Sequence, residues 1–321
     1  MKILILRLSS LGDIILTTPL IQELRAKYPE ARIDLVLKKE YTGIADHFPW
    51  LSHIFALDTT KGTSEIQRLN GEFKKIGFDH VLDLHNNFRS RRLRRGLGGS
   101  LHVIDKRTFK RWFLIKTKIN LLKNEPDIIG RYFETAKSPG ITDTGTGATF
   151  GKEFLRSPAK KAALCPGAKH WNKRWLPEYY VEVAKDLIAK GFQIEFFGSA
   201  EENEYVGSIA SQLPQDKVTN LCGKLSLAEL PGRMAECSLA ITNDSGLMHV
   251  ASAVGMPTIA IFGPTVREFG FMPRNTNVQI VENLNLDCRP CTTIGLDHCP
   301  KGHFKCMKEI VPSVVFSIIN K

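Results

Sequence analysis

The chain has 321 residues, of which 43% are hydrophobic and 24% charged, and a formal net charge of +11. This length suits about two domains, and the composition excludes disordered and collagen-like chains. No apolar run reaches the ~20 residues that a membrane-spanning helix needs, and the apolar run at residues 1–7 is too short for a signal peptide. We therefore expect a cytoplasmic protein whose seven cysteines form no disulfide framework.

The positive charge is concentrated in one stretch of sequence. Residues 89–123 contain twelve basic residues and one acid, so this stretch carries 12 − 1 = +11, and the rest of the chain is neutral. Such a stretch predicts a polyanionic partner, either nucleic acid or phosphorylated lipid at a membrane surface, or else a solvated basic face. Its apolar residues, Phe109 and 112–115, either lie at an interface or belong to the core.

Short apolar runs alternate with amphipathic stretches, which is the pattern of parallel α/β units. The sequence predicts a first helix that begins near Asp13 and ends before Pro29. A stretch rich in Gly, Thr, Ser and Pro, 138–160, predicts a linker between two similar halves. The predicted strands are 2–7, 32–37, 53–57, 79–84, 101–104, 161–165, 193–197, 238–242 and 257–261, and the later helices are 177–190, 202–212, 226–236 and 245–254.

The first chemical motif, Arg7-Leu8-Ser9-Ser10-Leu11-Gly12-Asp13, leads from a strand through a small-residue loop into a helix. Loops of this kind bind anions because backbone N–H groups and the helix dipole point at the ligand. The carboxylate of Asp13 has two interpretations here, an N-cap of the helix or a general base in a ligand site. The glycine spacing is not that of a Walker or dinucleotide-binding motif.

A second loop, residues 165–177, also lies between a strand and a helix, and it carries Lys169, Lys173 and Arg174. Cations at the carboxyl end of a strand can neutralise a diphosphate. The alternative is an exposed polar loop in which Trp175 anchors the following helix.

The third motif, Thr242-Asn243-Asp244-Ser245-Gly246-Leu247-Met248-His249, is the most informative. A strand ends there and a helix begins, so Asp244 can cap the helix and the amides of residues 245–247 can receive a phosphate. Gly246 allows a ligand to approach the backbone closely, and His249 follows about one turn later on the same face. The alternative is a capped helix with a packed histidine.

Four late cysteines, Cys288, Cys291, Cys299 and Cys306, begin with a Cys-x2-Cys spacing. Four thiolates with such a start are a candidate zinc site. Because the second pair lacks this spacing, reduced and mostly buried thiols are the favoured interpretation.

The order and spacing of these motifs resemble glycosyltransferase family 9, the ADP-heptose–lipopolysaccharide heptosyltransferases, over essentially the whole chain. The resemblance also rests on residues 83–90 (Asp-Leu-His-Asn-Asn-Phe-Arg-Ser) and 262–265 (Phe-Gly-Pro-Thr). It implies an α/β GT-B fold of two Rossmann-like domains with a central cleft. The implied parts are an acceptor-binding domain over 1–150, a nucleotide-sugar-binding domain over 160–306, and a helix in 307–321 that packs back on the first domain.

The resemblance also implies roles for single residues. Asp13 corresponds to the catalytic base and Lys173 to the lysine that contacts the diphosphate, and either Glu201 or Glu202 holds the ribose. The implied donor-binding residues are Ser9, Ser10, Gly12, Lys173, Glu201, Glu202, Asp244, Ser245, Gly246 and His249. The implied acceptor-binding residues are Arg89, Arg91, Arg92, Arg94 and Arg95.

The implied reaction is inverting transfer of heptose from ADP-L-glycero-β-D-manno-heptose to a lipopolysaccharide inner-core acceptor, with no required cofactor. A phosphorylated lipid A–core acceptor implies peripheral contact with the cytoplasmic face of the inner membrane. The alternatives are a GT-B transferase or epimerase that uses a different nucleotide-sugar, and a non-catalytic sugar-binding relative, against which Asp13 argues. A nucleic-acid-binding protein is a further alternative, but the chain contains no RNA or DNA motif.

Overall fold

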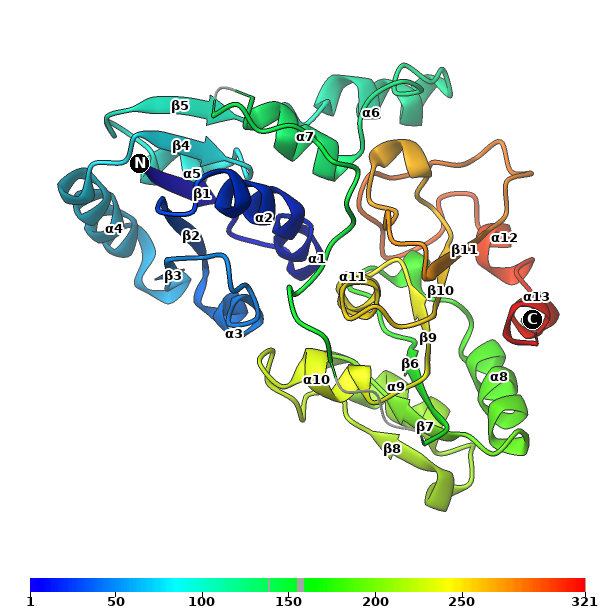
Figure 1. The fold of residues 1–321 in the computed structure, drawn as a ribbon. Coiled ribbons are helices and arrows are strands. Elements are labelled where there is room, and N and C mark those ends of the chain that lie inside the picture. Colours follow the sequence, from blue (N-terminus) through cyan, green and yellow to red (C-terminus); the bar gives the residue numbers. More distant parts are fainter. Residues whose placement is uncertain (138, 155–158, 321) are drawn as a thin grey trace. The chain divides into compact units, whose positions relative to one another are not determined.

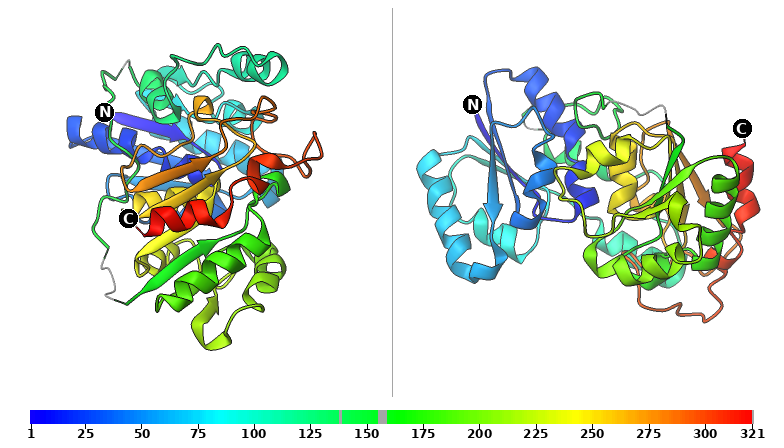
Figure 2. Two further views of the ribbon diagram at one scale, coloured as in Figure 1. Left: turned by 90° about the vertical axis from the view of Figure 1, so that its right-hand side faces the viewer. Right: turned by 90° about the horizontal axis from the view of Figure 1, so that it is seen from below.

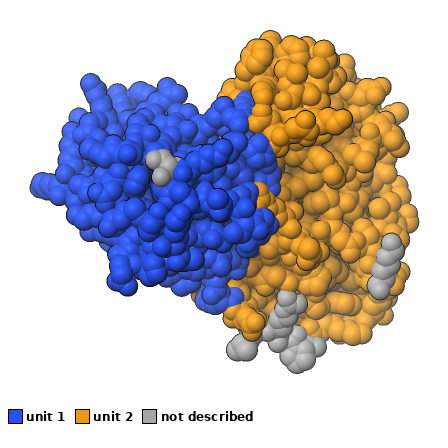
Figure 3. Space-filling model, turned by 45° about the horizontal axis from the view of Figure 1, so that its top comes forward, with its two compact units in different colours: residues 1–107, 126–152 blue, residues 108–125, 153–321 orange. Residues whose placement is uncertain are grey.

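The computed structural model describes residues 1–137, 139–154 and 159–320. It divides into two compact units, which are coloured separately in Figure 3. Unit 1 consists of Met1–Arg107 and Pro126–Lys152, and unit 2 consists of Thr108–Glu125 and Glu153–Lys321. The chain therefore leaves unit 1 at residue 107, returns at residue 126, and leaves it again at residue 152.

Unit 1 contains a five-stranded parallel sheet with the strand order β3-β2-β1-β4-β5 (Figure 1). The strands are β1 (Lys2–Leu6), β2 (Arg32–Lys38), β3 (His53–Leu57), β4 (His80–Asp83) and β5 (Ser100–Val103). The helices are α1 (Leu11–Ile15), α2 (Thr18–Lys27), α3 (Thr42–Ala45), α4 (Gly62–Ile76), α5 (Phe88–Leu93) and α7 (Ile128–Thr135). Helix α2 packs beside α7, and α4 packs beside α5.

The centre of this sheet is β1, whose residues Ile3–Leu6 are all fully buried. A parallel strand covered by helices on both faces needs such a continuous apolar run, rather than an alternating one. Leu4 and Leu6 pack in one cluster with Val36 of β2 and Phe73 of α4. This packing fixes the carboxyl end of β1, from which the first motif emerges.

Unit 2 contains a six-stranded parallel sheet with the strand order β11-β10-β9-β6-β7-β8. The strands are β6 (Lys161–Cys165), β7 (Gln193–Phe196), β8 (Val218–Asn220), β9 (Leu239–Asn243), β10 (Thr258–Phe262) and β11 (Val278–Glu282). The helices are α6 (Thr108–Thr117), α8 (Pro177–Ala189), α9 (Asn203–Ala210), α10 (Leu230–Ala235), α11 (Gly246–Ala253), α12 (Lys305–Lys308) and α13 (Pro312–Ile319).

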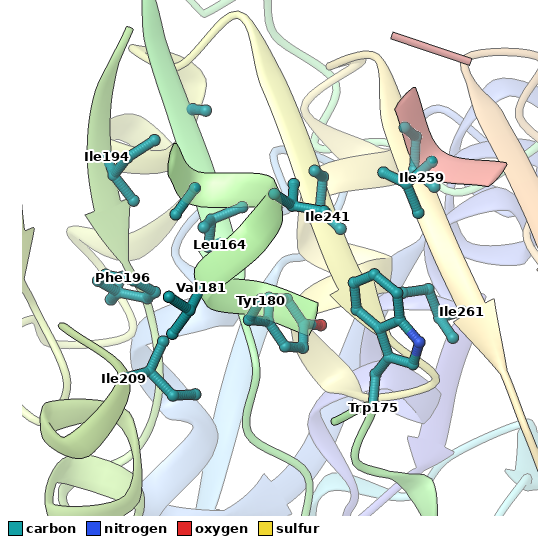
Figure 4. Close-up of a cluster of buried hydrophobic side chains, with 14 of the residues drawn as sticks. Leu164, Trp175, Tyr180, Val181, Ile194, Phe196, Ile209, Ile241, Ile259 and Ile261 are labelled. Atoms are coloured by element: carbon teal, nitrogen blue, oxygen red, sulfur yellow. The ribbon is translucent and has the colours of Figure 1, made fainter. Parts of the chain in front are cut away.

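Trp175 lies in the large hydrophobic cluster of unit 2, which Figure 4 shows in close-up. The indole is fully buried, its N–H donates to the Ile310 carbonyl at 2.8 Å, and its ring contacts Tyr180 edge-on. Trp175 thus anchors the start of α8, which was part of the alternative interpretation of this loop.

The last helix, α13, packs against α8 (Figure 2). Its fully buried Val315 belongs to the hydrophobic cluster of unit 2. The resemblance implies that residues 307–321 pack back on the first domain, whereas this helix is part of unit 2. The apolar face of α13 explains the difference, because it completes the helix layer over the sheet of unit 2.

All nine predicted strands are confirmed to within one residue at each end, while β8 and β11 were not predicted. The predicted single helix from near Asp13 to before Pro29 is wrong, because α1 ends at Ile15 and α2 begins at Thr18. Helix α1 begins at Leu11, since Ser10 rather than Asp13 is its N-cap. The described part of the predicted linker, residues 139–154 and 159–160, contains no helix or strand, and its residues 138 and 155–158 lie outside the described residues. Within the described chain, no helix has both the length and the apolar character required to cross a bilayer.

Candidate functional site

In unit 1 the direction of strand addition reverses between β1 and β4, which are neighbours in the sheet although β2 and β3 separate them in sequence. Ligands of open parallel sheets bind outside the carboxyl ends of the strands at such a switch point. The loop of residues 7–10 follows β1, and residues 84–87 follow β4. Topology therefore brings the first motif and the Asp-Leu-His-Asn-Asn segment to the same edge.

Asp13 lies at the third position of α1, and both of its carboxylate oxygens are engaged. Oδ1 forms an ion pair with Arg7 Nη2 at 2.6 Å, and Oδ2 accepts hydrogen bonds from the N–H and the hydroxyl of Ser10 at 3.1 and 2.7 Å. Burial alone would raise the pKa of Asp13, but the Arg7 guanidinium and the Ser10 hydrogen bonds hold it below its ordinary value. The carboxylate is therefore ionised at neutral pH, which is the form that accepts a proton.

Arg7 is itself buried and held by the neighbouring chain segments. Its Nη1 donates to the Leu84 carbonyl at 2.5 Å, and its guanidinium lies 5.7 Å from the centre of the Tyr132 ring. The Tyr132 hydroxyl in turn donates to the Asp13 carbonyl at 3.4 Å. Arg7 was not predicted as a site residue, because an arginine at the end of a strand gives no sign of which carboxylate it meets.

The loop after β4 is organised by Asp83, which is fully buried. Its carboxylate accepts from the N–H groups of His85 and Asn86 at 3.1 and 2.7 Å and from the Ser90 hydroxyl at 3.0 Å. It also pairs with Arg94 Nε at 2.9 Å. Arg94, which the sequence analysis assigned to the acceptor, therefore points inward and fixes this loop.

His85 interacts electrostatically with both Arg7 and Asp13. Its burial, together with the positive charges of Arg7 and Lys106, lowers the pKa of its imidazole to about 3. The ring is therefore neutral at physiological pH. A neutral imidazole beside Asp13 leaves the Arg7 guanidinium as the cation that pairs directly with this carboxylate.

The other arginines of the predicted acceptor set are exposed, and these are Arg89, Arg91, Arg92 and Arg95. Two of them, Arg92 and Arg95, line a groove of about 580 Å³ between α4 and α5 together with Lys74. The Arg92 guanidinium stacks 4.1 Å from the centre of the Phe88 ring. None of these three cations pairs with a carboxylate in the part of the chain that the structure describes, so the groove carries uncompensated positive charge.

The basic stretch 89–123 contributes residues to both units. Residues 89–107 belong to unit 1, and residues 108–123 belong to unit 2. Several of its cations are also neutralised or used in packing: Arg107 pairs with Asp105 and Glu134, and Lys110 pairs with Glu125. The cations of this stretch are therefore divided between the two units.

In unit 2 the equivalent switch point lies between β6 and β9, which are neighbours in the sheet. The second motif follows β6 and the third follows β9, so both reach this edge. Asn243, the last residue of β9, ties the two loops together. Its Nδ2 donates to the Pro166 carbonyl at 2.8 Å, and its Oδ1 accepts from the Trp175 N–H at 3.0 Å.

Asp244 and Lys173, which the sequence placed in different motifs, form an ion pair of 2.5 Å. The Thr265 hydroxyl also donates to Asp244 Oδ2 at 2.7 Å. Burial alone would raise the pKa of Asp244, but Lys173, the Thr265 hydrogen bond and the charge of His249 lower it. Asp244 is therefore an ionised group that positions Lys173, and it is not the predicted helix cap.

The N-cap of α11 is Ser245, whose extended backbone leads into Gly246. The Ser245 hydroxyl is buried and has no hydrogen-bond partner in the described structure. The first amides of a helix are also without partners inside the helix, and together these donors suit a phosphate oxygen. His249 follows one turn later, buried within the same helix.

The two candidate ribose residues differ in their surroundings. Glu201 is exposed, whereas Glu202 is half-buried and accepts from the Ser199 N–H at 2.8 Å. A Cβ added to Gly167 would overlap the Glu202 carboxylate, so Glu202 lies directly against the loop that carries Lys173. The structure brings Glu202, and not Glu201, to the switch point of unit 2.

The candidate zinc site is not assembled. Among the described residues, no group of three or more His, Cys, Asp or Glu side chains is placed to hold a metal ion, and the cysteines are free thiols. Cys299 Sγ accepts the Phe304 N–H at 3.4 Å. Cys306 is buried in the hydrophobic cluster of unit 2, and this burial raises the pKa of its thiol to about 12. These two thiols are used in packing.

Comparisons with known proteins identify the family of the chain. The sequence profile of glycosyltransferase family 9 (heptosyltransferase) matches residues 66–298. The chain is 30% identical over 300 residues to the lipopolysaccharide heptosyltransferase 2 of Escherichia coli K12, covering 84% of each chain. It is 30% identical over 332 residues to the lipooligosaccharide heptosyltransferase 2 of Campylobacter jejuni, covering 100% of this chain and 99% of that protein.

Solved structures show the same fold. An E. coli structure titled ADP-heptose lps heptosyltransferase II has a TM-score of 0.79 and 25% identity, and covers 100% of this chain and 98% of its own. A family 9 glycosyltransferase from Veillonella parvula has a TM-score of 0.80 and 22% identity, and covers 99% of this chain and 96% of its own.

Two Rossmann-like parallel sheets, each with polar loops at its switch point, form the GT-B fold of these heptosyltransferase structures. The chain belongs to glycosyltransferase family 9, the family described as heptosyltransferases. This membership confirms the resemblance drawn from the motifs.

Proposed function

We propose that this enzyme transfers heptose from ADP-L-glycero-β-D-manno-heptose to a lipopolysaccharide inner-core acceptor, with inversion at the anomeric carbon and Asp13 as general base. The names of the E. coli and C. jejuni relatives support the reaction class. The observation that carries the mechanism is the ionised Asp13 carboxylate, held at the switch point of unit 1 by Arg7 and Ser10.

A sugar hydroxyl is a weak nucleophile, so its proton must leave as the new bond forms. In the proposed step the acceptor oxygen attacks the anomeric carbon of the donor while the bond between that carbon and the ADP oxygen breaks. Asp13 takes the hydroxyl proton, and ADP departs with the bonding electrons. One displacement from the face opposite ADP inverts the anomeric centre.

The leaving diphosphate gains negative charge in this step, and unit 2 offers donors for it. Lys173 has three N–H donors, and its pairing with Asp244 leaves others for a phosphate oxygen. The Ser245 hydroxyl and the amides at the start of α11 add neutral donors. In this proposal Glu202, whose carboxylate lies against Gly167, accepts from the ribose hydroxyls. The proposal includes no cofactor.

The groove between α4 and α5 is the proposed site for an acceptor phosphate. Lys74, Arg92 and Arg95 line it and form no ion pair with a carboxylate among the described residues, and guanidinium groups bind phosphate with paired hydrogen bonds. A lipid-linked acceptor would also bring the enzyme into peripheral contact with the cytoplasmic face of the inner membrane.

The base assignment is tested by Asp13→Asn, measured as transfer of ADP-heptose to a truncated lipopolysaccharide core and analysed by mass spectrometry. Loss of a general base lowers kcat by about 10²–10⁴, while ADP binding by unit 2 is unchanged. Glu201→Gln is the matched control, because this exposed carboxylate lies outside the proposed chemistry. Turnover retained by Asp13→Asn would remove Asp13 from the role.

The donor assignment is tested by ligand-induced stabilisation. ADP-heptose and ADP should raise Tm more than UDP does, and Lys173→Met should weaken ADP binding by roughly tenfold or more, as expected for a charge-assisted contact. Greater stabilisation by UDP would replace heptose transfer with the alternative of a GT-B transferase using another nucleotide-sugar. Glu202→Gln should weaken ADP binding, whereas Glu201→Gln should not.

The acceptor assignment is tested by Arg92→Gln combined with Arg95→Gln. This variant should raise the KM for a phosphorylated core acceptor and leave ADP affinity unchanged. Arg94 is left intact because its pairing with buried Asp83 supports the fold. An unchanged acceptor KM would show that the groove is not used by the acceptor.

A further inference from the structure

The chain between Thr108 and Glu125, called here the α6 segment, carries an unusual amount of exposed apolar surface. Phe109 is 65% exposed, Trp112 is 53% exposed, Ile119 is 57% exposed and Leu121 is 44% exposed. Single exposed apolar residues are normal on protein surfaces, but a concentration of large ones marks an interaction site.

The two exposed aromatic residues lie along one side of α6, and Ile119 and Leu121 follow the end of this helix. Phe109, Trp112 and Lys116 follow one another at intervals of three and four residues, which places them on one helix face. The Phe109 and Trp112 rings lie 6.0 Å apart. A helix that packs in the ordinary way turns such aromatic residues toward the core, whereas α6 turns them outward.

The opposite side of the segment holds it firmly on unit 2. Leu114 and Leu122 are buried in a small cluster with Phe269. Arg111 donates to the Phe269 carbonyl at 3.0 Å, and Lys118 donates to the Cys288 and Pro290 carbonyls at 3.0 and 2.6 Å. The exposure of the aromatic residues is therefore imposed by this anchoring, and it does not result from a loosely attached helix.

The charge of the segment is also mostly positive. It contains five basic residues, and its one acid, Glu125, pairs with Lys110. Lys116 and Lys123 are exposed and make no ion pair within the described residues. Exposed aromatic and aliphatic side chains beside unpaired lysines are the pattern of a helix that lies in the interface of a bilayer with anionic lipids.

We propose that the α6 segment is a membrane-docking surface that inserts Phe109, Trp112, Ile119 and Leu121 among the acyl chains and places Lys116 and Lys123 at anionic headgroups. The combination favours a lipid surface. An apolar protein partner would offer no anion to Lys116 and Lys123, and an acidic peptide would offer no apolar surface to the aromatic residues. This surface lies outside the proposed catalytic and donor-binding residues, and its function does not depend on the identity of the transferred sugar.

The test is co-sedimentation of the full-length protein with vesicles, without donor or acceptor. Wild-type protein should bind vesicles of mixed phosphatidylglycerol and phosphatidylcholine more tightly than vesicles of pure phosphatidylcholine. Phe109→Ala with Trp112→Ala should lower the partition coefficient by about tenfold or more, since each change removes a large buried apolar group. Leu284→Ala, at a residue that is 75% exposed elsewhere in unit 2, is the matched control and should bind like wild type.

The electrostatic part is tested by Lys116→Glu with Lys123→Glu. Each lysine near an anionic surface is worth about 1 kcal/mol, or about fivefold in affinity, so this variant should bind mixed vesicles at least tenfold more weakly and lose the preference for anionic lipid. Both side chains are exposed and unpaired, so the circular dichroism spectrum should match that of wild type.

Two results would overturn the proposal. One is wild-type protein that does not bind anionic vesicles, or binds them as well without the two aromatic residues. The other is a concentration-dependent dimer, seen by analytical ultracentrifugation, that Trp112→Ala dissociates, because the face would then be covered by a second copy of the chain. Transfer to a water-soluble core oligosaccharide reports separately on the proposed activity, and it should be the same for wild type and for the Phe109 and Trp112 variant.

Discussion

Replacement of Arg7 by methionine tests the arrangement around Asp13 most directly. Methionine keeps the length and the apolar stem of the arginine, but it removes the guanidinium that lies 2.6 Å from Asp13 Oδ1. Asp13 then remains in its buried position with only the Ser10 hydrogen bonds. The Leu84 carbonyl also loses its donor.

The cost of this change follows from burial. The side chains of Arg7 and Asp13 are only 9% and 16% exposed, and removal of one partner of a buried ion pair costs about 3–5 kcal/mol. Because Asp13 keeps its Ser10 hydrogen bonds and some contact with water, we expect the lower end, about 3 kcal/mol. The loss of stability should be visible as a lower urea midpoint without a change in slope.

The pH dependence of the stability difference between wild type and Arg7→Met tests this explanation more directly. In the wild type the pKa of Asp13 is lowered by Arg7, so the contribution of the pair is complete above the unfolded value of ~3.9 and is lost as the pH falls through the folded value. In the variant, burial without Arg7 raises the pKa of Asp13, so protonation at mildly acidic pH relieves the penalty. The stability difference should therefore be larger at neutral pH than near pH ~4.

Urea unfolding of four proteins, followed by circular dichroism, completes the experiment. The double variant Arg7→Met with Asp13→Asn removes both charges, so it should be more stable than the sum of the two single changes predicts. Additive losses, together with a stability difference that does not change with pH, would refute the view that Arg7 serves to compensate Asp13.

Three further substitutions test the packing within the two units. Gly167→Ala should weaken ADP binding and lower Tm, because its Cβ would displace the Glu202 carboxylate; unchanged ADP affinity would contradict the position of Glu202. Gly71→Ala, in the middle of α4 where a Cβ meets no atom within 4 Å, should instead stabilise the protein by about 0.5–1 kcal/mol in urea unfolding. Trp175→Ala should cost about 3–5 kcal/mol, and a small loss in calorimetry would show that this indole does not support α8.

The strands were predictable because parallel strands covered on both faces need continuous apolar runs, as in Lys2–Leu6 and Thr258–Phe262. The motifs that contain Asp13 and Lys173 were found for the same reason, because they follow such runs. The short and half-exposed strand Val218–Asn220 offers no run of this kind, and it was missed.

The partners of the site residues were not predictable from one sequence. Asn243 and Trp175 are 68 residues apart, and Thr265 and Asp244 are 21 apart, yet they are hydrogen-bonded. Local sequence does not predict such a contact, since it depends on the order of strands in the sheet. The division of the basic stretch between two units was hidden for the same reason, because it is decided by contacts of the α6 segment with residues far along the chain.

Those distant contacts determine how late in synthesis the α6 segment can pack. Arg111 binds a carbonyl 158 residues later, and Lys118 binds carbonyls 170 and 172 residues later. During synthesis the α6 segment therefore leaves the ribosome long before its partners exist, while unit 1 can close around residues 107 and 126 without it. A nascent chain that ends near residue 152 presents the aromatic segment with both of its faces unsatisfied, which makes this stage the most exposed to aggregation and to binding by chaperones.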